Sequence, residues 1–252
     1  MEPQYAGQYR ELYERHWWWR ARERILVSLL QELFPASREL RILDVGCGDG
    51  LFFAELERFG SVEGVEPDAG LLVKDGPRDA RIFQGSLEEL PGSRKYDLVL
   101  MLDVIEHIEH EQPLLEAARE RLSEKGYLLV TVPAFMALWT HHDELNRHYR
   151  RYTKGQLRRT IEGAGLAVER LEYVFVWPAI VKLVGHHLEK WWPNKGRTAH
   201  IPTHWVNRTL AGISRAEYAV TSWIGAPFGS SAIAVARRCP GSGQRKPEGD
   251  RE

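Results

Sequence analysis

Residues Arg41 to Gly50 read RILDVGCGDG, and the interpretation of the whole chain starts from this stretch. A short apolar run containing one acid, Asp44, is followed by the alternating glycines Gly46, Gly48 and Gly50. Apolar residues at helical spacing come next, so the pattern predicts a strand, a glycine turn and a helix. Because glycine has no Cβ, a ligand can lie directly against the main chain of such a turn. The N–H groups and dipole at the start of the following helix favour an anionic group there.

The spacing of the glycines indicates which kind of nucleotide this turn would bind. In the dinucleotide fingerprint G-x-G-x-x-G, the third glycine would fall on Leu51, so the chain does not match that motif. A second predicted strand, residues 61–66, ends in Glu66, whose carboxylate can accept hydrogen bonds from both hydroxyls of a ribose. The turn and this acid together resemble the class I S-adenosylmethionine-dependent methyltransferases, whose first motif is D-x-G-x-G-x-G.

This resemblance implies a fold, a cofactor and a set of residues that contact it. The fold is α/β, a doubly wound, Rossmann-like, seven-stranded methyltransferase sheet with helices on both faces, and the cofactor is S-adenosyl-L-methionine. In the loop over the adenine the family often has an aspartate, whereas this chain has Ser86, whose main chain could serve instead. The implied cofactor contacts are Asp44, Gly46, Cys47, Gly48, Gly50, Glu66, Pro67, Ser86, Leu87, Asp103, His107 and Arg22.

The N-terminal residues 8–34 show helical spacing and carry three consecutive tryptophans beside three arginines. One interpretation is a helix that packs on the sheet through its aromatic face, with the arginines in solvent or stacked on indoles. The other follows the resemblance, in which an N-terminal helix covers the cofactor and an arginine pairs with its methionine carboxylate. Arg22 is the candidate for that role.

Tyr96 to Leu102 form a nearly unbroken apolar run, as expected for a parallel strand covered on both faces. Ligands in doubly wound sheets bind at the carboxyl ends of the strands. Asp103 and His107 follow this strand, so we expect them to face the cofactor. For His107 the alternative is a residue at the start of a helix whose hydrogen bonds are satisfied locally.

The remaining pattern predicts alternating helices and strands. A helix is expected to begin at Pro67-Asp68, and the last strand should be antiparallel by resemblance. Helices are further expected over 111–122 and 154–163, and strands over 81–84, 127–132, 165–177 and 231–237.

Composition and length favour a single domain with appendages. The 252 residues carry a net charge of −1 and two distant cysteines, so neither nucleic-acid binding nor a disulfide scaffold is expected. No apolar run reaches the roughly 18 residues that a membrane span requires, and the polar N-terminus lacks a signal peptide, so we predict a cytoplasmic protein. The domain should cover 1–238, with a cap helix in 1–35, a helical insert over 178–229 and a disordered tail over 239–252; the oligomeric state stays open.

A dense group of polar residues lies between Ala134 and Thr153, after the fifth strand, where we expect the rim of the active site. A solvated charged loop is the alternative. A metal bound by the adjacent histidines is not expected, because neighbouring residues point in different directions on a strand or a helix. His142 and His148 are predicted bases, with Asp143 orienting one of them and Asp103 or His107 as substitutes. Predicted substrate contacts are His141, Arg147, Arg150, Arg151 and Tyr152.

The insert contains a predicted apolar helical face over 177–192 and a second helix over 205–223. A lid or a contact between subunits is one interpretation of this insert. Peripheral contact with lipid, or a pocket for a hydrophobic substrate, is the other.

The predicted function is methyl transfer from S-adenosylmethionine to a small-molecule acceptor, through O-methylation of an anionic or hydrophobic metabolite. A methyltransferase acting on RNA, DNA or protein is an alternative. The near-zero net charge argues against it, as does LDVIEH at 102–107, where base-amino methylases carry an Asn/Asp-Pro-Pro-Tyr/Phe motif. A nucleotide-binding oxidoreductase is the other alternative.

Overall fold

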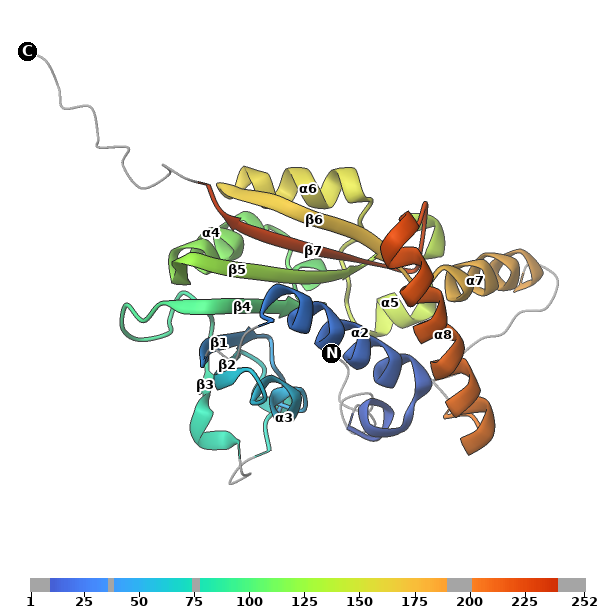
Figure 1. The fold of residues 1–252 in the computed structure, drawn as a ribbon, viewed down its shortest axis with the longest axis horizontal. Helices are drawn as coiled ribbons and strands as arrows, with labels where there is room; N and C mark the ends of the chain where they lie inside the picture. The colour runs from blue at the N-terminus through green and yellow to red at the C-terminus, as the bar shows by residue number, and fades with distance from the viewer. Residues whose placement is uncertain (1–9, 36–38, 74–77, 190–200, 240–252) are drawn as a thin grey trace, which may run out of the picture.

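The computed structural model describes residues 10–35, 39–73, 78–189 and 201–239. One seven-stranded sheet has the order β3-β2-β1-β4-β5-β7-β6 (Figure 1). Strands β1 to β5 pair in parallel, and β7 runs antiparallel to both β5 and β6. This topology confirms the doubly wound sheet and the antiparallel last strand. The strands are β1 (Leu40–Val45), β2 (Gly60–Glu66), β3 (Ile82–Gln84), β4 (Tyr96–Leu102), β5 (Leu122–Pro133), β6 (Leu166–Val174) and β7 (Ser231–Arg238).

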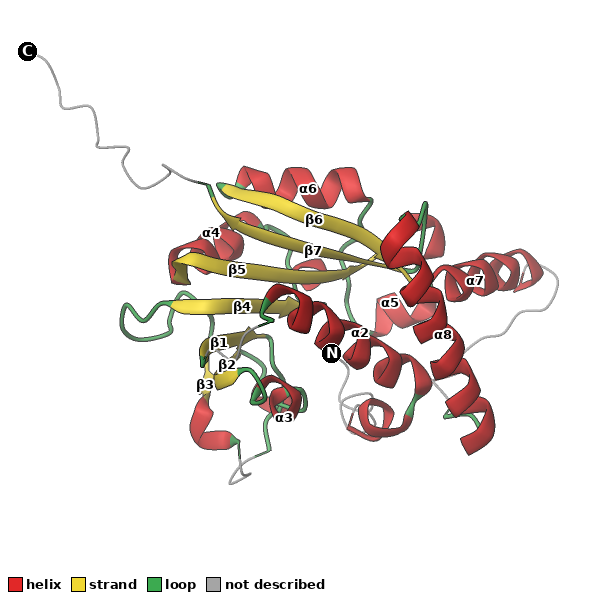
Figure 2. Ribbon diagram, viewed as in Figure 1, coloured by secondary structure: helices red, strands yellow, loops and turns green. Residues whose placement is uncertain are grey.

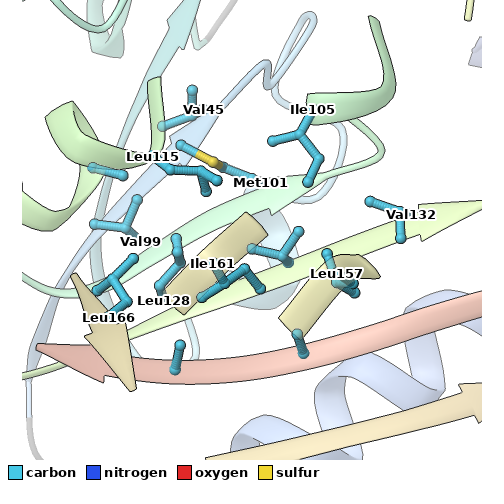
Figure 3. Packing of buried hydrophobic residues seen from close by; sticks show 14 of the residues in the cluster. Val45, Val99, Met101, Ile105, Leu115, Leu128, Val132, Leu157, Ile161 and Leu166 are labelled. Atoms are coloured by element: carbon cyan, nitrogen blue, oxygen red, sulfur yellow. The ribbon is translucent and has the colours of Figure 1, made fainter. Parts of the chain in front are cut away.

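Helices cover both faces of the sheet (Figure 2). On one face α2 and α8 pack together; on the other lie α4 and α6, whose Leu115, Leu157 and Ile161 meet side chains of the sheet in the buried cluster of Figure 3. The α-helices are α2 (Trp17–Leu33), α3 (Phe53–Leu56), α4 (Gln112–Arg121), α5 (His141–Leu145), α6 (Lys154–Gly163), α7 (Val176–Glu189) and α8 (His204–Ile224). Short 3₁₀ turns are η1 (Ala69–Leu71), η2 (Asp79–Arg81), η3 (Ile105–His107) and η4 (Met136–Leu138).

The single N-terminal helix expected over 8–34 is two helices. Residues 10–15 form the first helix and α2 begins at Trp17. Between them His16 adopts an extended conformation, with φ −79° and ψ 134°, and its ring accepts a hydrogen bond from the Trp18 N–H. A histidine that caps the following helix in this way ends the preceding one, so the two helices can lie at an angle over the sheet.

One further helix prediction was wrong, and another predicted helix is shorter than expected. No α-helix follows Glu66 in the described residues, where Asp68 accepts a hydrogen bond from the Gly70 N–H and only the 3₁₀ turn η1 forms. Asp side chains that bond their own main chain favour turns over helices, which accounts for the difference. After the glycine turn, α3 has only 4 residues, which leaves little helix dipole to attract a ligand.

The predicted strand over 165–177 is shorter in the structure. β6 ends at Val174 because Phe175 adopts a left-handed conformation, with φ 65°, that turns the chain into α7. Both insert helices, α7 and α8, then lie near the carboxyl ends of β4 and β5 (Figure 1). No helix among the described residues has the length and apolarity needed to cross a bilayer. The domain division stays a prediction, and most of the tail, 240–252, lies outside the described residues.

Candidate active site at the carboxyl ends of the central strands

The glycine turn after β1 has the backbone geometry that only glycine adopts readily. Gly46, Gly48 and Gly50 have φ values of 71°, 55° and 71°. A Cβ on Gly46 would lie 2.7 Å from the Val104 side chain, whereas a Cβ on Gly48 would meet nothing within 4 Å. Gly46 therefore permits close packing of the turn against the end of β4, and Gly48 borders open space where a ligand can approach.

Glu66, at the end of β2, is bonded directly to this turn. Its side chain is 4% exposed; Oε2 accepts the Gly48 N–H at 2.9 Å and Oε1 accepts the Asp68 N–H at 2.8 Å. Burial raises the pKa of Glu66, while these two main-chain bonds oppose the shift. Each carboxylate oxygen can accept more than one hydrogen bond, so Glu66 keeps acceptor capacity toward a ligand.

Cys47 has a packing role in the turn. A Cβ on Gly64 would lie 2.4 Å from the Cys47 sulfur, so the thiol occupies the space that this glycine leaves on β2. Burial also raises the pKa of Cys47, which disfavours the reactive thiolate.

The N-terminal helix α2 brings Arg22 to the same edge of the sheet. Arg22 Nη2 lies 2.8 Å from Asp103 Oδ2 and 2.7 Å from Thr131 Oγ1. The guanidinium also lies 5.6 Å and 5.8 Å from the ring centroids of Trp18 and Trp19. The aromatic rings therefore pack the helix and the arginine reaches the ends of β4 and β5. The pairing of Arg22 with the methionine carboxylate of the cofactor stays a prediction.

Asp103 has an unusual backbone conformation, with φ 59°. Strained conformations of non-glycine residues cost energy and cluster at functional sites. Its Oδ1 accepts a hydrogen bond from Thr131 Oγ1 at 2.9 Å, so both carboxylate oxygens have partners.

A small cavity of about 40 Å³ lies between the glycine turn and the N-terminal helices. Asp44 borders it, and burial raises the pKa of that carboxyl to about 7, against the opposing charge of Arg22. A larger cavity of about 380 Å³ lies elsewhere, mainly among side chains of α2, with Glu55, Arg58 and Arg215 on its other side. The small cavity is lined by Tyr13, Trp19, Arg22, Glu23, Leu26, Asp44, Gly46, Cys47, Leu51, Phe52 and Leu102.

The loop expected over the adenine contains Ser86 and Leu87. The Ser86 N–H donates to Glu89 Oε2 at 2.8 Å, and the Leu87 side chain is 1% exposed within the core. Pro67 is exposed beside Glu66. The buried Leu87 side chain leaves only its backbone for a ligand, and the contacts of Ser86 and Leu87 with the cofactor stay predictions.

Asp143 organises the polar segment after β5. Its carboxylate is fully buried and bonded to both Arg151 Nε and Nη2 at 2.8 Å, to His148 Nδ1 at 2.9 Å and to the Thr140 N–H at 2.8 Å. Burial alone would raise the pKa of Asp143, but the bonds from His148 and Arg151 hold it well below its usual value. The predicted pairing of Asp143 with one histidine is therefore present, and that histidine is His148.

The other predicted rim residues do not form one cluster. Arg151 and Tyr152 are 4% and 2% exposed, and Arg150 bonds Glu111 Oε2 at 2.6 Å. His141 and Arg147 are exposed, with His141 Nδ1 lying 3.0 Å from Glu144 Oε2. His142 lies on the exposed part of α5, where its Nε2 is 3.2 Å from Asn146 Nδ2. Roles for these residues in binding substrate stay predictions.

His107 is near the Asp143–His148 pair, and burial lowers its pKa to about 4, so its ring is neutral at pH 7. Three polar residues at this edge were not predicted as site residues from the sequence: Tyr13, Glu106 and Thr131. Of the three, only Glu106 could have been identified from the sequence, because it is an acid beside His107 directly after a predicted buried strand.

A family model described as a methyltransferase domain matches residues 18–171 of this chain. The chain belongs to this methyltransferase family. Its cofactor is S-adenosylmethionine, and the residues fit it: Gly48 borders open space, buried Glu66 keeps acceptor capacity, and Arg22 provides a cation. The predictions of family and cofactor are thereby confirmed.

Curated relatives of this methyltransferase cover only part of its length. A ubiquinone biosynthesis O-methyltransferase from Azorhizobium caulinodans is 32% identical over 148 residues, which are 55% of this chain and 48% of the relative. A trans-aconitate 2-methyltransferase from Deinococcus radiodurans is 34% identical over 111 residues, 42% of each chain. The alignments thus span about half the length of these relatives.

Solved structures agree with the fold of this methyltransferase. A possible histamine N-methyltransferase from Thermotoga maritima has a TM-score of 0.55 and 16% identity, and the alignment covers 94% of this chain and 97% of that one. At this identity the similarity concerns the fold alone.

Proposed function

We propose that this methyltransferase transfers a methyl group to an oxygen atom of a small anionic or hydrophobic acceptor. The main support is the pair of relatives named for ubiquinone biosynthesis O-methylation and for trans-aconitate. One name concerns a hydrophobic quinone and the other a small polycarboxylate. A cytoplasmic location and the absence of a nucleic-acid substrate belong to the same proposal.

For the cofactor, we propose the contacts that the sequence analysis predicts. The glycine turn would hold the cofactor against its backbone, Glu66 would accept ribose hydroxyls, and Arg22 would face the methionine carboxylate. S-adenosylmethionine supplies a methyl group already activated by a sulfonium. The chain therefore has to orient the acceptor oxygen and exclude water, which are the effects of positioning and desolvation.

For the acceptor, we propose that His148, oriented by Asp143, takes the proton of the reacting hydroxyl, with His142 as the other candidate. The bond from His148 Nδ1 to the Asp143 carboxylate leaves Nε2 as the acceptor of a proton in the neutral ring. A histidine oriented by a buried carboxylate is a common general base. Exposed Arg147 would attract an anionic acceptor toward this rim.

The insert favours a hydrophobic acceptor or a lipid surface. On α8, Trp205, Trp223 and Ile224 are 72%, 91% and 77% exposed, and α7 exposes four further aliphatic side chains. Monomeric soluble proteins seldom expose so many large apolar side chains together. We propose that α7, within 177–192, and α8 contact lipid peripherally while an acceptor reaches the site. The exposed side chains of α7 are Ile180, Val181, Leu183 and Val184.

The test is a methyl-transfer assay with the full chain. Purified protein is incubated with S-adenosylmethionine and a panel of phenols, catechols and small carboxylic acids, and products are identified by mass spectrometry. We expect S-adenosylhomocysteine to form only with an acceptor, which gains one methyl group on oxygen. Methylation of nitrogen, or of added RNA or protein in place of every small acceptor, would refute the proposal.

A further inference from the structure

A cluster of three potential metal ligands lies next to the cofactor edge of the sheet. Glu106, His107 and His148 each offer one ligand atom, and these atoms lie within 4.8 Å of one another. Glu106 and His107 belong to η3, directly after β4, whereas His148 comes from the segment after β5. From the sequence, a metal was considered only at the adjacent His141 and His142, and none was predicted. Tertiary folding, however, brings together residues that are distant in the sequence.

Glu106 is a buried acid whose carboxylate has no hydrogen-bond partner within the part of the chain that the structure describes. It is fully buried, and both its carboxylate oxygens lack any hydrogen-bond partner among the described residues. Buried polar groups are nearly always bonded, because removing a carboxylate from water without compensation is costly. A cation bound between Glu106 and the two histidines would supply the missing partner.

Both histidines have the outer hydrogen bonds that metal ligands usually have. His148 Nδ1 lies 2.9 Å from Asp143 Oδ1, and since the Asp143 carboxylate is paired with Arg151 and only accepts, Nδ1 carries the proton. The Nε2 lone pair of His148 is therefore available. The His107 ring bonds the main chain of Asn146, and the two imidazole rings lie 4.6 Å apart at 84°. In metal sites such bonds hold the ring and fix the tautomer.

We propose that Glu106, His107 and His148 bind one divalent transition-metal ion of the Zn²⁺ type. Two imidazoles and one carboxylate are a donor set for zinc and related ions that leaves a coordination position open. Ligand atoms bound to the same ion at about 2.1 Å lie no more than about 4.2 Å apart. The observed separation therefore requires only a small inward movement of the side chains on binding.

The position of this cluster connects it to the cofactor turn. The Val104 side chain packs so closely on Gly46 that it leaves no room for a Cβ there, and Val104 precedes Glu106 by two residues. The ion would therefore lie beside the glycine turn proposed to hold the cofactor. An ion there would bind the acceptor oxygen and lower its pKa, with the proton released to water. This use rests on the proposed function, whereas the metal site itself does not. Because ion and proton compete for the same lone pair, the ion would replace His148 as the activating group.

The experiment measures metal binding without cofactor or acceptor. The full chain is stripped with EDTA and titrated with Zn²⁺ against a chromophoric chelator. We expect one Zn²⁺ per chain, and weaker binding of Mg²⁺ because imidazole ligands suit zinc better. Glu106→Gln and His107→Ala should each lower the affinity by about 100-fold or more, beyond the 10- to 100-fold loss that removal of an outer partner causes.

Matched controls come from the same segment. Glu109→Gln and His110→Ala change the same residue types three positions further along, where both side chains are exposed, and should bind Zn²⁺ as the wild type does. Far-UV circular dichroism and thermal unfolding establish that each variant is folded. Less than one Zn²⁺ per chain, or Glu106→Gln and His107→Ala binding as tightly as the controls, would overturn the proposal. Failure to methylate any acceptor would leave a positive metal result intact.

Discussion

Four buried carboxylates differ because of the groups around them. Asp44, Glu66, Glu106 and Asp143 are each at most 4% exposed. Asp143 has Arg151 as a bidentate partner, and its pKa falls. Glu66 has only main-chain N–H partners, and its pKa rises, as do those of Asp44 and Glu106. Burial raises a carboxyl pKa unless a cation or strong donors compensate, so partners rather than depth decide the charge of each acid.

Replacing Glu66 by Ala should weaken binding of S-adenosylhomocysteine by roughly 1–3 kcal/mol, because hydrogen bonds to the ribose are lost. Isothermal calorimetry at neutral pH measures the change. Glu66→Gln separates loss of charge from loss of the side chain. Glu63→Gln, three residues earlier on β2, is the control and should bind as the wild type does. Unchanged affinity in Glu66→Ala would remove this residue from the cofactor site.

Replacing Asp143 by Asn should destabilise the protein by about 3–5 kcal/mol at pH 7, because Arg151 would remain buried without its counter-charge. The lowered pKa of Asp143 sets the pH dependence: its stabilisation is complete above the ordinary value of 3.8 and is lost as the pH falls below it. The difference in the free energy of unfolding between the wild type and Asp143→Asn should therefore shrink from pH 7 to pH 3. Urea unfolding at several pH values measures it.

The control for this change is Glu144→Gln. Glu144 is the next residue and is exposed, so its substitution should alter the free energy of unfolding by no more than about 0.5 kcal/mol. Equal stability of Asp143→Asn and wild type at pH 7 would contradict the structural role of the ion pair.

At the scale of elements, the segment after β5 and the insert differ in which side chains they bury and expose. The short helix α5 is held by the buried bonds of Asp143, including the capping contact with Thr140. By contrast, α7 and α8 expose large apolar side chains near the carboxyl ends of the strands. The buried bonds of the segment after β5 would suit the catalytic positioning that we propose, and the apolar helices would suit the proposed contact with a lipid or a hydrophobic ligand.

The insert should bind lipid vesicles through α8. Trp223→Glu should reduce co-sedimentation with anionic vesicles, because a charge replaces an exposed indole that would enter the interface. Thr209→Ala, on the same helix, is the control and should sediment as the wild type does. Tryptophan fluorescence should shift to shorter wavelength when vesicles are added to the wild type. If the wild type does not bind vesicles of any composition, the lipid proposal fails and the lid interpretation of the insert is favoured.

At the scale of the whole molecule, the N-terminal helices close over the cofactor turn. Tyr13 and Trp19 line the small cavity beside this turn, and Tyr13 OH donates to Glu23 Oε2 at 2.8 Å. The cavity of about 40 Å³ is far smaller than the roughly 300–1,000 Å³ of ordinary ligand pockets. If the cofactor binds at this turn as proposed, we expect residues 10–15 and the start of α2 to move when it enters.

Hydrogen exchange with and without S-adenosylhomocysteine measures this movement. Amides of residues 10–26 should change their exchange more than those of α4 and α6, which lie on the opposite face of the sheet. Amides of the glycine turn should become protected in the same samples. Unchanged exchange over 10–26, in samples where the turn is protected, would show that the cofactor binds without displacing the cap.

Much of the fold and the cofactor turn could be predicted from the sequence because local pattern determines them. The glycine turn, β4 as Tyr96–Leu102, α6 as Lys154–Gly163 and the acid that ends β2 are read directly from apolar runs, glycines and caps. Local conformations that compete with regular helix and strand also explain the wrong element boundaries. Asp68 and Phe175 take conformations that no periodicity reveals, and they shorten the expected elements after Glu66 and in β6.

Only the tertiary structure decided which polar groups meet at the edge of the sheet. Arg22 reaches Asp103, and His148 meets both Asp143 and His107, across long stretches of chain whose approach depends on packing of helices against strands. The sequence by itself determined the parallel core and the glycine turn after β1, since those depend on neighbouring residues. The environment of a side chain such as Glu106, its burial and its missing partner, arises from contacts between distant segments and therefore required the folded structure.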